Sequence, residues 1–85
     1  MITQSIGNVA TVLFNKTQGA ILSLLYMHPD RSYYLRQIVR LTGAGLGPVQ
    51  RELKKLTVSG IITRLDSGHQ VYFKANEKSP IYQEL

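Results

Sequence analysis

The spacing of apolar residues changes at Gly60, and this change limits the folds open to the chain more than any other feature. Before Gly60 the apolar residues recur at three- and four-residue steps, the spacing of one helix face: Leu46, Val49, Leu53 and Leu56. After it, two runs rich in β-branched and aromatic residues, 61–65 and 70–75, flank the polar residues 66–69. Two such runs joined by a short polar loop predict a β-hairpin.

Two helices are predicted immediately before this hairpin. The shorter one runs from Leu35 to about Leu41 and is followed by Gly43, which suits the left-handed conformation that ends a helix. The longer one opens near Gly45, has a proline in its first turn and runs to about Ser59. The sequence therefore predicts a helix, a tight turn and a second helix.

Apolar residues at helical spacing also occupy the N-terminal third of the chain. A helical arm is expected up to about residue 16, and Thr17 is the predicted N-cap of a separate helix. The apolar stripe of that helix consists of Ala20, Ile21, Leu24, Leu25 and Met27. Pro29 ends it, because the residue before a proline is pushed out of the helical region.

Short segments complete the outline. Tyr33 and Tyr34 favour a brief strand that could pair with the hairpin, and the Ser-Pro pair at 79–80 predicts the start of a C-terminal helix within residues 77–85. The order of elements is that of a winged helix-turn-helix. We expect a single domain, residues 1–85, that is mainly α with a small β-hairpin wing (α+β). Flanking helical segments at both ends would join a three-helix core.

The positive charge of the chain is concentrated in segment 31–64. This segment has seven basic residues and one acid, Glu52, and so a net charge of +6, whereas the rest of the chain carries −1. Such an asymmetry is the electrostatic footprint of a surface that meets phosphates. Because the segment coincides with the predicted helix-turn-helix, which presents a helix to a DNA groove, the pattern favours double-stranded DNA as the partner.

The outward face of helix 45–59 carries the side chains best suited to reading DNA. Gln50 and Arg51 can form bidentate hydrogen bonds with adenine and guanine edges, and lysines reach phosphates as point charges. The predicted contacts of this helix are Gly47, Gln50, Arg51, Lys54 and Lys55. The alternative is that these basic residues only keep an exposed helix face soluble.

Two further groups are predicted to contact the DNA backbone or minor groove. The first surrounds the shorter helix, which in this motif crosses the backbone: Ser32, Tyr34, Arg36 and Arg40. By strand alternation, one of Tyr33 and Tyr34 belongs to the core instead. The second group is the wing: Arg64, Ser67, Gly68, His69 and Gln70. Any small hairpin has a polar tip, so the wing alone carries little weight.

Composition excludes several functional classes. The chain has no cysteine, and its only histidines are His28 and His69, so neither a disulfide nor a metal site is expected. No nucleophile elbow, phosphate-binding glycine loop or paired-carboxylate pattern occurs, and we expect neither an enzyme nor a bound cofactor. No apolar run reaches the roughly 18–20 residues of a membrane span, which predicts a soluble, cytoplasmic protein without a membrane partner.

Five segments carry a resemblance to a known family: 33–38, 42–43, 46–53, 56–64 and 71–76. They resemble ArsR-like winged-helix transcriptional regulators of prokaryotes, over about residues 15–85, most specifically in Val49-Gln50-Arg51-Glu52-Leu53. The resemblance implies DNA binding as a homodimer, with this helix in the major groove and the hairpin as wing. The metal-sensing branch uses cysteine or histidine clusters that this chain lacks, so a metal response is not implied. Many relatives have a hydroxyl residue where this chain has Gly45, which weakens the helix cap.

The predicted homodimer would form through the two ends of the chain. The apolar residues expected at this contact are Ile2, Ile6, Val9, Leu13, Ile81, Tyr82 and Leu85. Two alternatives to a DNA-binding regulator stay open. The winged helix could be a docking module for another protein, with an incidental basic surface. It could also be the N-terminal targeting domain of a longer protein such as a nucleotidyltransferase, because similar segments occur at the front of such chains.

Overall fold

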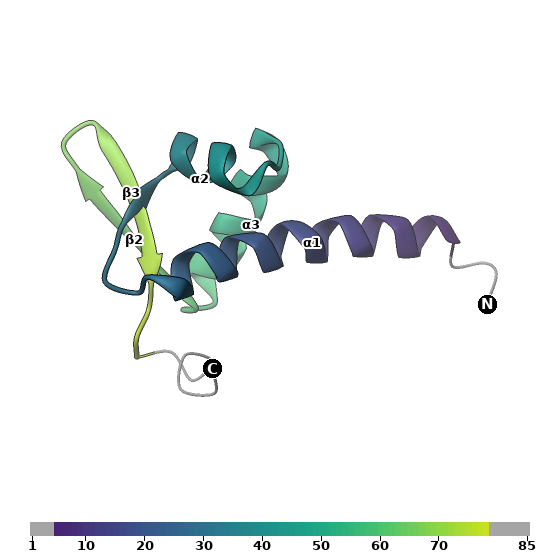
Figure 1. Ribbon diagram of the computed structural model, residues 1–85, viewed down its shortest axis with the longest axis horizontal. Coiled ribbons are helices and arrows are strands. Elements are labelled where there is room, and N and C mark those ends of the chain that lie inside the picture. Colours follow the sequence, from purple (N-terminus) through teal and green to yellow (C-terminus); the bar gives the residue numbers. More distant parts are fainter. Residues whose placement is uncertain (1–4, 79–85) are drawn as a thin grey trace.

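Three helices and a small antiparallel sheet make up the described part of the chain (Figure 1). The computed structural model describes the backbone of residues 5–78 and the side chains of residues 16–78. The elements, in chain order, are α1 (Ser5–Met27), β1 (Tyr33–Tyr34), α2 (Leu35–Thr42), α3 (Leu46–Val58), β2 (Ile62–Ser67) and β3 (Gln70–Ala75). The strands are ordered β1-β3-β2. This is a winged helix, as predicted, and the brief strand at Tyr33 does pair with the hairpin.

Helix α1 is continuous, so the predicted helix start at Thr17 was wrong. A residue that caps a helix well can also lie inside one. Between residues 13 and 20 Gly19 disfavours helix most, at a cost of only about 1 kcal/mol, and no proline interrupts the segment. The two apolar stripes therefore join in one helix that extends beyond the rest of the domain towards the N-terminus (Figure 1). It ends at Met27, two residues before Pro29, as expected. No helix within residues 5–78 is both long enough and apolar enough to cross a membrane.

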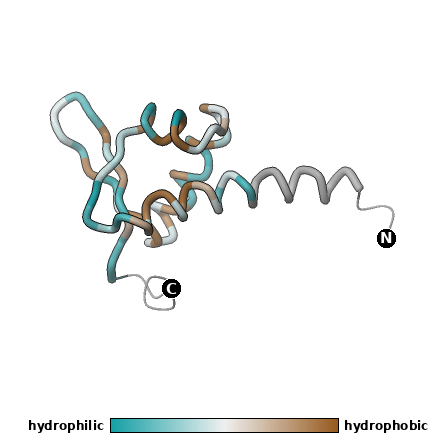
Figure 2. Tube along the Cα trace, in the orientation of Figure 1, coloured by the Kyte–Doolittle hydropathy of each residue, from teal (hydrophilic) through white to brown (hydrophobic). Residues whose placement is uncertain are grey.

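The core lies where the three helices meet the sheet. Figure 2 shows hydrophobic residues gathered along the helices there, and a hydrophilic hairpin end. The buried hydrophobic residues are Ile21, Leu25, Tyr33, Ile38, Val49, Leu53, Leu56, Ile62, Phe73 and Ala75. Two residues of the apolar stripes identified in the sequence are exposed, Leu46 at 50% and Met27 at 71%. Met27 is the last residue of α1 and Leu46 the first of α3.

The turn between α2 and α3 is held by its own backbone and one hydroxyl. The Thr42 Oγ1 donates to the Ile38 carbonyl at 2.7 Å, and the Gly43 amide donates to the Val39 carbonyl at 3.1 Å. Gly43 has φ 74°, a left-handed conformation that a residue with a side chain rarely adopts. The predicted helix stop is therefore confirmed, and the turn sets the direction in which α3 leaves.

The hairpin loop is shorter than the sequence suggested. Asp66 pairs with Val71 and Ser67 with Gln70, so the predicted four-residue loop is reduced to Gly68 and His69. Gly68 has φ 61° and no non-glycine residue in the described chain has positive φ, which is the pattern of a two-residue loop with glycine first. Polar residues such as Asp66 resemble loop in sequence, but here they extend the ladder.

The base of the hairpin is tied to the end of α1. The Tyr26 hydroxyl donates to the Ile61 carbonyl and lies 3.4 Å from the Asn76 carbonyl. Asn76 in turn donates from its backbone to the Ile61 carbonyl at 3.3 Å and from its side chain to the Gly60 carbonyl at 2.8 Å. These bonds hold the base of the hairpin closed and against the end of α1.

Candidate nucleic-acid interface

The outward face of α3 has the composition that the sequence predicted. Its exposed polar and basic side chains are those of Gln50, Arg51, Lys54 and Lys55, and Gly47 is exposed beside them. The opposite face packs into the core through Val49, Leu53 and Leu56. Because three cations share one exposed face with no acid between them, this side of α3 attracts anions.

The start of α3 has a glycine on either side of the half-exposed Leu46. Gly45 is the N-cap, in an extended conformation and without a side-chain cap hydrogen bond, as its lack of a hydroxyl implied. A methyl group on Gly47 would meet only the Arg51 Nη2, at 4.0 Å. Within the described residues, then, neighbouring packing does not require glycine at 47. Its effect is a flat helix start beside Arg51.

Glu52 is the one acid on α3, and it points inward. Glu52 is only 3% exposed, and its Oε1 accepts a hydrogen bond from the Nε2 of Gln18 in α1 at 3.3 Å. The inward orientation of Glu52 was not predicted. The position lies between Val49 and Leu56 at steps of three and four residues, and that spacing was the available signal for an inward orientation.

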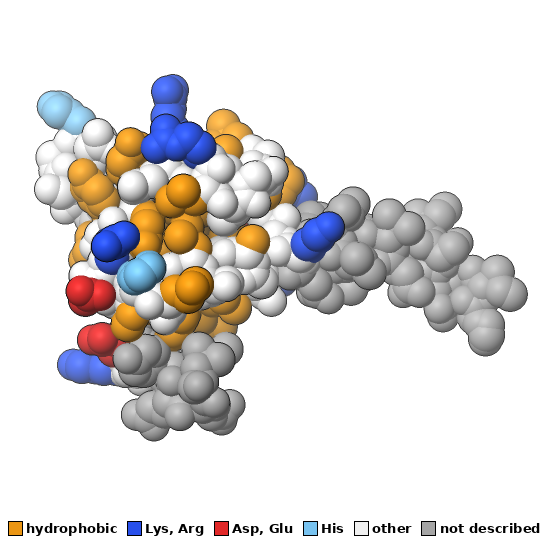
Figure 3. All heavy atoms as spheres, viewed as in Figure 1, with side chains coloured by type: hydrophobic (Ala, Val, Ile, Leu, Met, Phe, Trp, Pro, Cys, Tyr) orange, Lys and Arg blue, Asp and Glu red, His pale blue; other side chains and the backbone are white. Residues whose placement is uncertain are grey.

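The predicted backbone contacts are grouped around α2. Arg36 and Arg40 are exposed, and Figure 3 shows Lys and Arg side chains standing over α2, whereas acidic side chains lie near the ends of α1 and β3. Ser32 is partly exposed just before β1. Of the two tyrosines, Tyr33 is the core residue, 3% exposed. The partly exposed Tyr34 packs edge-to-face against Tyr72, with ring centroids 6.1 Å apart.

The predicted wing residues divide into two places. Ser67, Gly68, His69 and Gln70 are exposed at the far end of the hairpin. Arg64, predicted at the base of the wing, lies in mid-strand opposite Phe73, and its Nε donates to Asp66 Oδ1 at 3.1 Å. Both partners of this ion pair are largely exposed, so it adds little stability.

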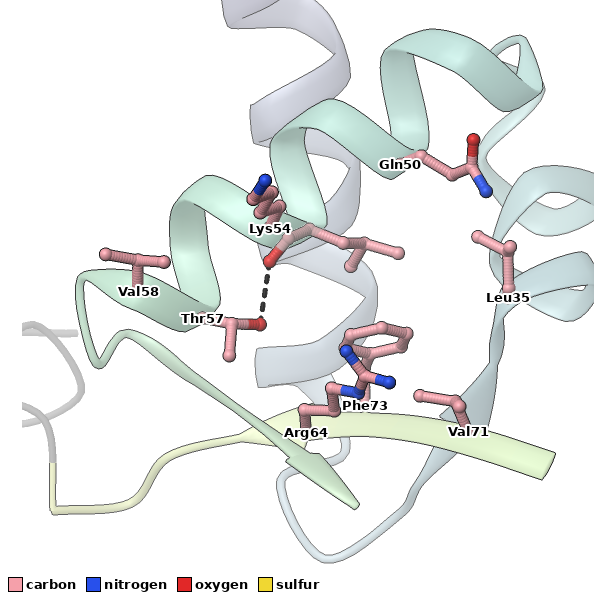
Figure 4. Close-up of a pocket in the computed structure, with 9 residues that line it drawn as sticks. Leu35, Gln50, Lys54, Thr57, Val58, Arg64, Val71 and Phe73 are labelled. Carbon is pink, nitrogen blue, oxygen red and sulfur yellow. Dashed lines mark hydrogen bonds between the residues drawn. The ribbon is translucent and has the colours of Figure 1, made fainter. Parts of the chain in front are cut away.

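Arg64 belongs instead to a cleft of about 600 Å³ between α3 and the sheet. Figure 4 shows its side chain reaching from β2 towards α3, with Gln50, Lys54 and Thr57 on the other side. The Thr57 hydroxyl is directed to its own helix, donating to the Leu53 carbonyl at 2.7 Å. Three residues predicted separately for the helix and the wing, Gln50, Lys54 and Arg64, therefore share one cleft.

The rest of the cleft is apolar, and no such cleft was predicted from the sequence. These lining residues are Leu35, Leu53, Val58, Val71 and Phe73. They come from α2, α3 and β3, so only the folded chain brings them together. Val58 had a sequence signal, because it lies four residues after Lys54 on the outward side of the helix, and it is 80% exposed. Arg51, Lys55, Arg36 and Arg40 do not line the cleft.

The predicted dimer contact and the expectation of no metal site concern other parts of the chain. The residues predicted to form a dimer contact lie outside the side chains that the structure describes: Ile2, Ile6, Val9, Leu13, Ile81, Tyr82 and Leu85. The predicted C-terminal helix is outside them as well. For metals, no three of the described histidine, aspartate and glutamate side chains come together in a group that could hold an ion.

The fold is similar to those of several solved structures. The ferric uptake regulator of Francisella tularensis, solved with iron, matches with a TM-score of 0.64 and 25% identity over 74% of this chain and 52% of that chain. This chain thus spans about half the length of that regulator. A homodimeric winged helix-turn-helix DNA-binding domain from Mycobacterium bovis, described as a possible ArsR-family transcriptional regulator, matches with a TM-score of 0.62 and 21% identity over 88% of this chain and 67% of that one.

Reduced HlyU of Vibrio cholerae also matches, with a TM-score of 0.62 and 13% identity over 99% of this chain and 88% of that chain. No protein-family model matches the chain, and no curated protein sequence matches it significantly. The structural matches show a winged helix, and two of the matched proteins are described as regulators.

Proposed function

We propose that this chain is a transcriptional regulator that binds double-stranded DNA in a sequence-specific manner. The observation that carries the proposal is the exposed face of α3, where Gln50, Arg51, Lys54 and Lys55 stand together without an acid. The hairpin follows directly, as in a winged helix whose second helix enters the major groove. The regulators among the structural neighbours support the same function.

In this arrangement the contacts divide by chemistry. Arg51 suits the two acceptors of guanine and Gln50 suits adenine, while Lys54 and Lys55 suit phosphates. The flat start of α3 at Gly47 lets the helix approach the groove closely. Around α2 the backbone contacts would be Ser32, Tyr34, Arg36 and Arg40, and residues 66–70 of the wing would lie on the minor groove or backbone.

We further propose that the regulator is ArsR-like and acts as a homodimer. The resemblance of residues 15–85 to that family supports this, as does the M. bovis domain, which is described as homodimeric. The dimer contact would use the apolar positions of the N-terminal arm, such as Val9 and Leu13, with Tyr82 near the other end. Two copies of α3 would then read half-sites separated by about one helical turn of DNA, or a multiple of it.

The DNA proposal is tested by selecting bound duplexes from a random pool and measuring affinity for the preferred site. Because Arg51 would read a base, Arg51→Ala should cost about 1–3 kcal/mol for that site and relax the preference at one position. Lys74→Ala is the matched control, since it removes one cation from the sheet face turned away from α3. Absence of binding to any duplex at low salt would refute the DNA proposal. Equal loss across all sequences would refute base reading by Arg51.

The dimer is tested separately by sedimentation. Val9→Asp places a charge on the proposed apolar contact and should shift the chain towards monomer, whereas Lys16→Asp, on an exposed position of the same helix, should not. A wild-type chain that sediments as a monomer at high concentration would contradict the dimer.

A further inference from the structure

The cleft between α3 and the sheet combines an apolar lining with cationic side chains. Its bottom is closed by Leu53 and Phe73, which are 1% and 8% exposed, and its sides include the partly exposed Leu35 and Val71. The phosphodiester backbone of DNA is polar, so its phosphates match the cations of the cleft but not its apolar lining. With a volume of about 600 Å³, the cleft falls within the size range of small-molecule sites.

The charged side chains that line the cleft are all cationic. Lys54 from α3 and Arg64 from β2 stand on opposite sides of it (Figure 4), and none of its lining residues, all within the described chain, is acidic. The nearby Asp66 accepts from the Arg64 Nε alone, and a guanidinium has four further N–H donors. The Gln50 amide adds a neutral donor on the side of α3.

We propose that this cleft binds a small amphipathic carboxylate, with an aromatic or branched apolar body. The carboxylate would lie between Lys54 and Arg64, and the apolar body would cover Phe73, Val71 and Leu35. Charge complementarity selects an anion, and the apolar floor selects one with a hydrophobic body over inorganic phosphate. Bidentate recognition of a carboxylate is also the geometry that arginine favours.

Occupation of the cleft would oppose DNA binding, and this consequence rests on the proposed function. Gln50 and Lys54 are assigned to DNA contacts and also line the cleft, and Lys54 would instead pair with the bound carboxylate. A ligand that binds only the DNA-free form must lower the apparent affinity for DNA by mass action. The small anion would therefore act as an effector that releases the regulator from its site.

The binding step is tested without DNA, using 2-naphthoate as the probe and the neutral 2-naphthamide as its matched control. Titration of the ¹⁵N-labelled chain should shift the amide resonances of residues 53–58, 64 and 71–73. Naphthoate should bind at least about tenfold more tightly than the amide, because only the carboxylate engages the two cations. Equal affinity of the two probes would overturn the proposal, as would shifts confined to α1 or absent altogether.

Variants localise the charge contacts. Lys54→Ala and Arg64→Ala should each weaken naphthoate binding about tenfold, as expected for loss of one charge-assisted contact. Lys74→Ala removes a cation of β3 whose side chain faces away from the cleft. This variant should leave the affinity for naphthoate unchanged. Val58→Asp places a negative charge on an exposed part of the cleft, so folding is not at risk, and it should abolish binding. If Lys74→Ala weakened naphthoate binding equally, the effect would come from general surface charge, and the proposed site would be wrong.

The competition step is then measured with the preferred duplex. Saturating naphthoate should lower DNA affinity for the wild type but not for Val58→Asp. If the duplex binds equally well with and without naphthoate, the effector role is refuted while the binding site stands. If no duplex binds at all, the proposed function fails, yet the naphthoate shifts still decide whether the cleft is a site.

Discussion

The two faces of α3 differ in what holds their side chains. On the inward face Val49, Leu53 and Leu56 are almost completely buried against α1, α2 and the sheet. On the outward face Gln50, Lys54 and Lys55 are exposed. The same thirteen-residue helix thus carries stability on one side and candidate recognition on the other. Substitutions on the two sides should therefore affect different measurements.

The largest effect is expected on the inward face. Leu56→Ala should lower the free energy of unfolding by about 2–5 kcal/mol, because it removes buried methyl groups and leaves a cavity. Urea denaturation measures this loss. Because the whole domain is stable by only about 5–15 kcal/mol, the milder Leu56→Val is measured as well, in case Leu56→Ala does not fold. A loss below that range would show that this face is not the packed core.

Glu52 is the inward exception, because it is a charged residue at a core position. Glu52→Ala should cost about 1–3 kcal/mol of unfolding free energy, since the Gln18 amide loses its acceptor in a partly buried place. Glu52→Gln keeps an acceptor oxygen and should cost less. If both variants unfold at the wild-type denaturant concentration, Glu52 contributes nothing to the α1–α3 contact.

A smaller effect is expected where the hairpin base joins α1. Tyr26→Phe removes the hydroxyl that donates to the Ile61 carbonyl and keeps the ring, so it should cost about 1 kcal/mol. Ser23→Ala, at an exposed position of the same helix, is the matched control. Equal stability of the Tyr26 and Ser23 variants would mean that the hydroxyl bond gives no net stabilisation.

The smallest stability effect is expected on the outward face. Lys55→Ala should change the free energy of unfolding by less than about 0.5 kcal/mol. It should, however, reduce the slope of log affinity for DNA against log salt by about 0.9, the value for one lost phosphate contact. Fluorescence anisotropy of a labelled duplex measures the slope. An unchanged slope would remove Lys55 from the interface.

Much of the fold could be predicted because local signals and tertiary structure agree. The change of apolar spacing at Gly60 predicted the hairpin, Gly43 predicted the turn between α2 and α3, and Pro29 predicted the end of α1. The helix start predicted at Thr17, which the structure does not have, shows the limit of local signals. A good capping residue does not start a helix when the preceding turn is already helical.

The candidate site could be predicted only in part. The outward residues of α3 followed from helical spacing, but the cleft did not. It depends on Leu35, Val71 and Arg64 being carried to one side of α3 by three different elements. The length of the wing loop also depended on pairing, because Asp66 and Ser67 have loop-like side chains and yet lie in the β2–β3 ladder.

The measurement that tests the central claim most directly is thiol protection by DNA. The chain has no cysteine, so single substitutions place one thiol at a chosen position. Gln50→Cys lies on the outward face of α3 and Ser23→Cys on an exposed position of α1. Addition of the preferred duplex should slow thiol labelling at Gln50→Cys about tenfold or more and leave Ser23→Cys unchanged, since a bound groove covers the outward face. Labelling slowed at Ser23→Cys alone, or at neither position while the duplex is bound, would contradict recognition through α3.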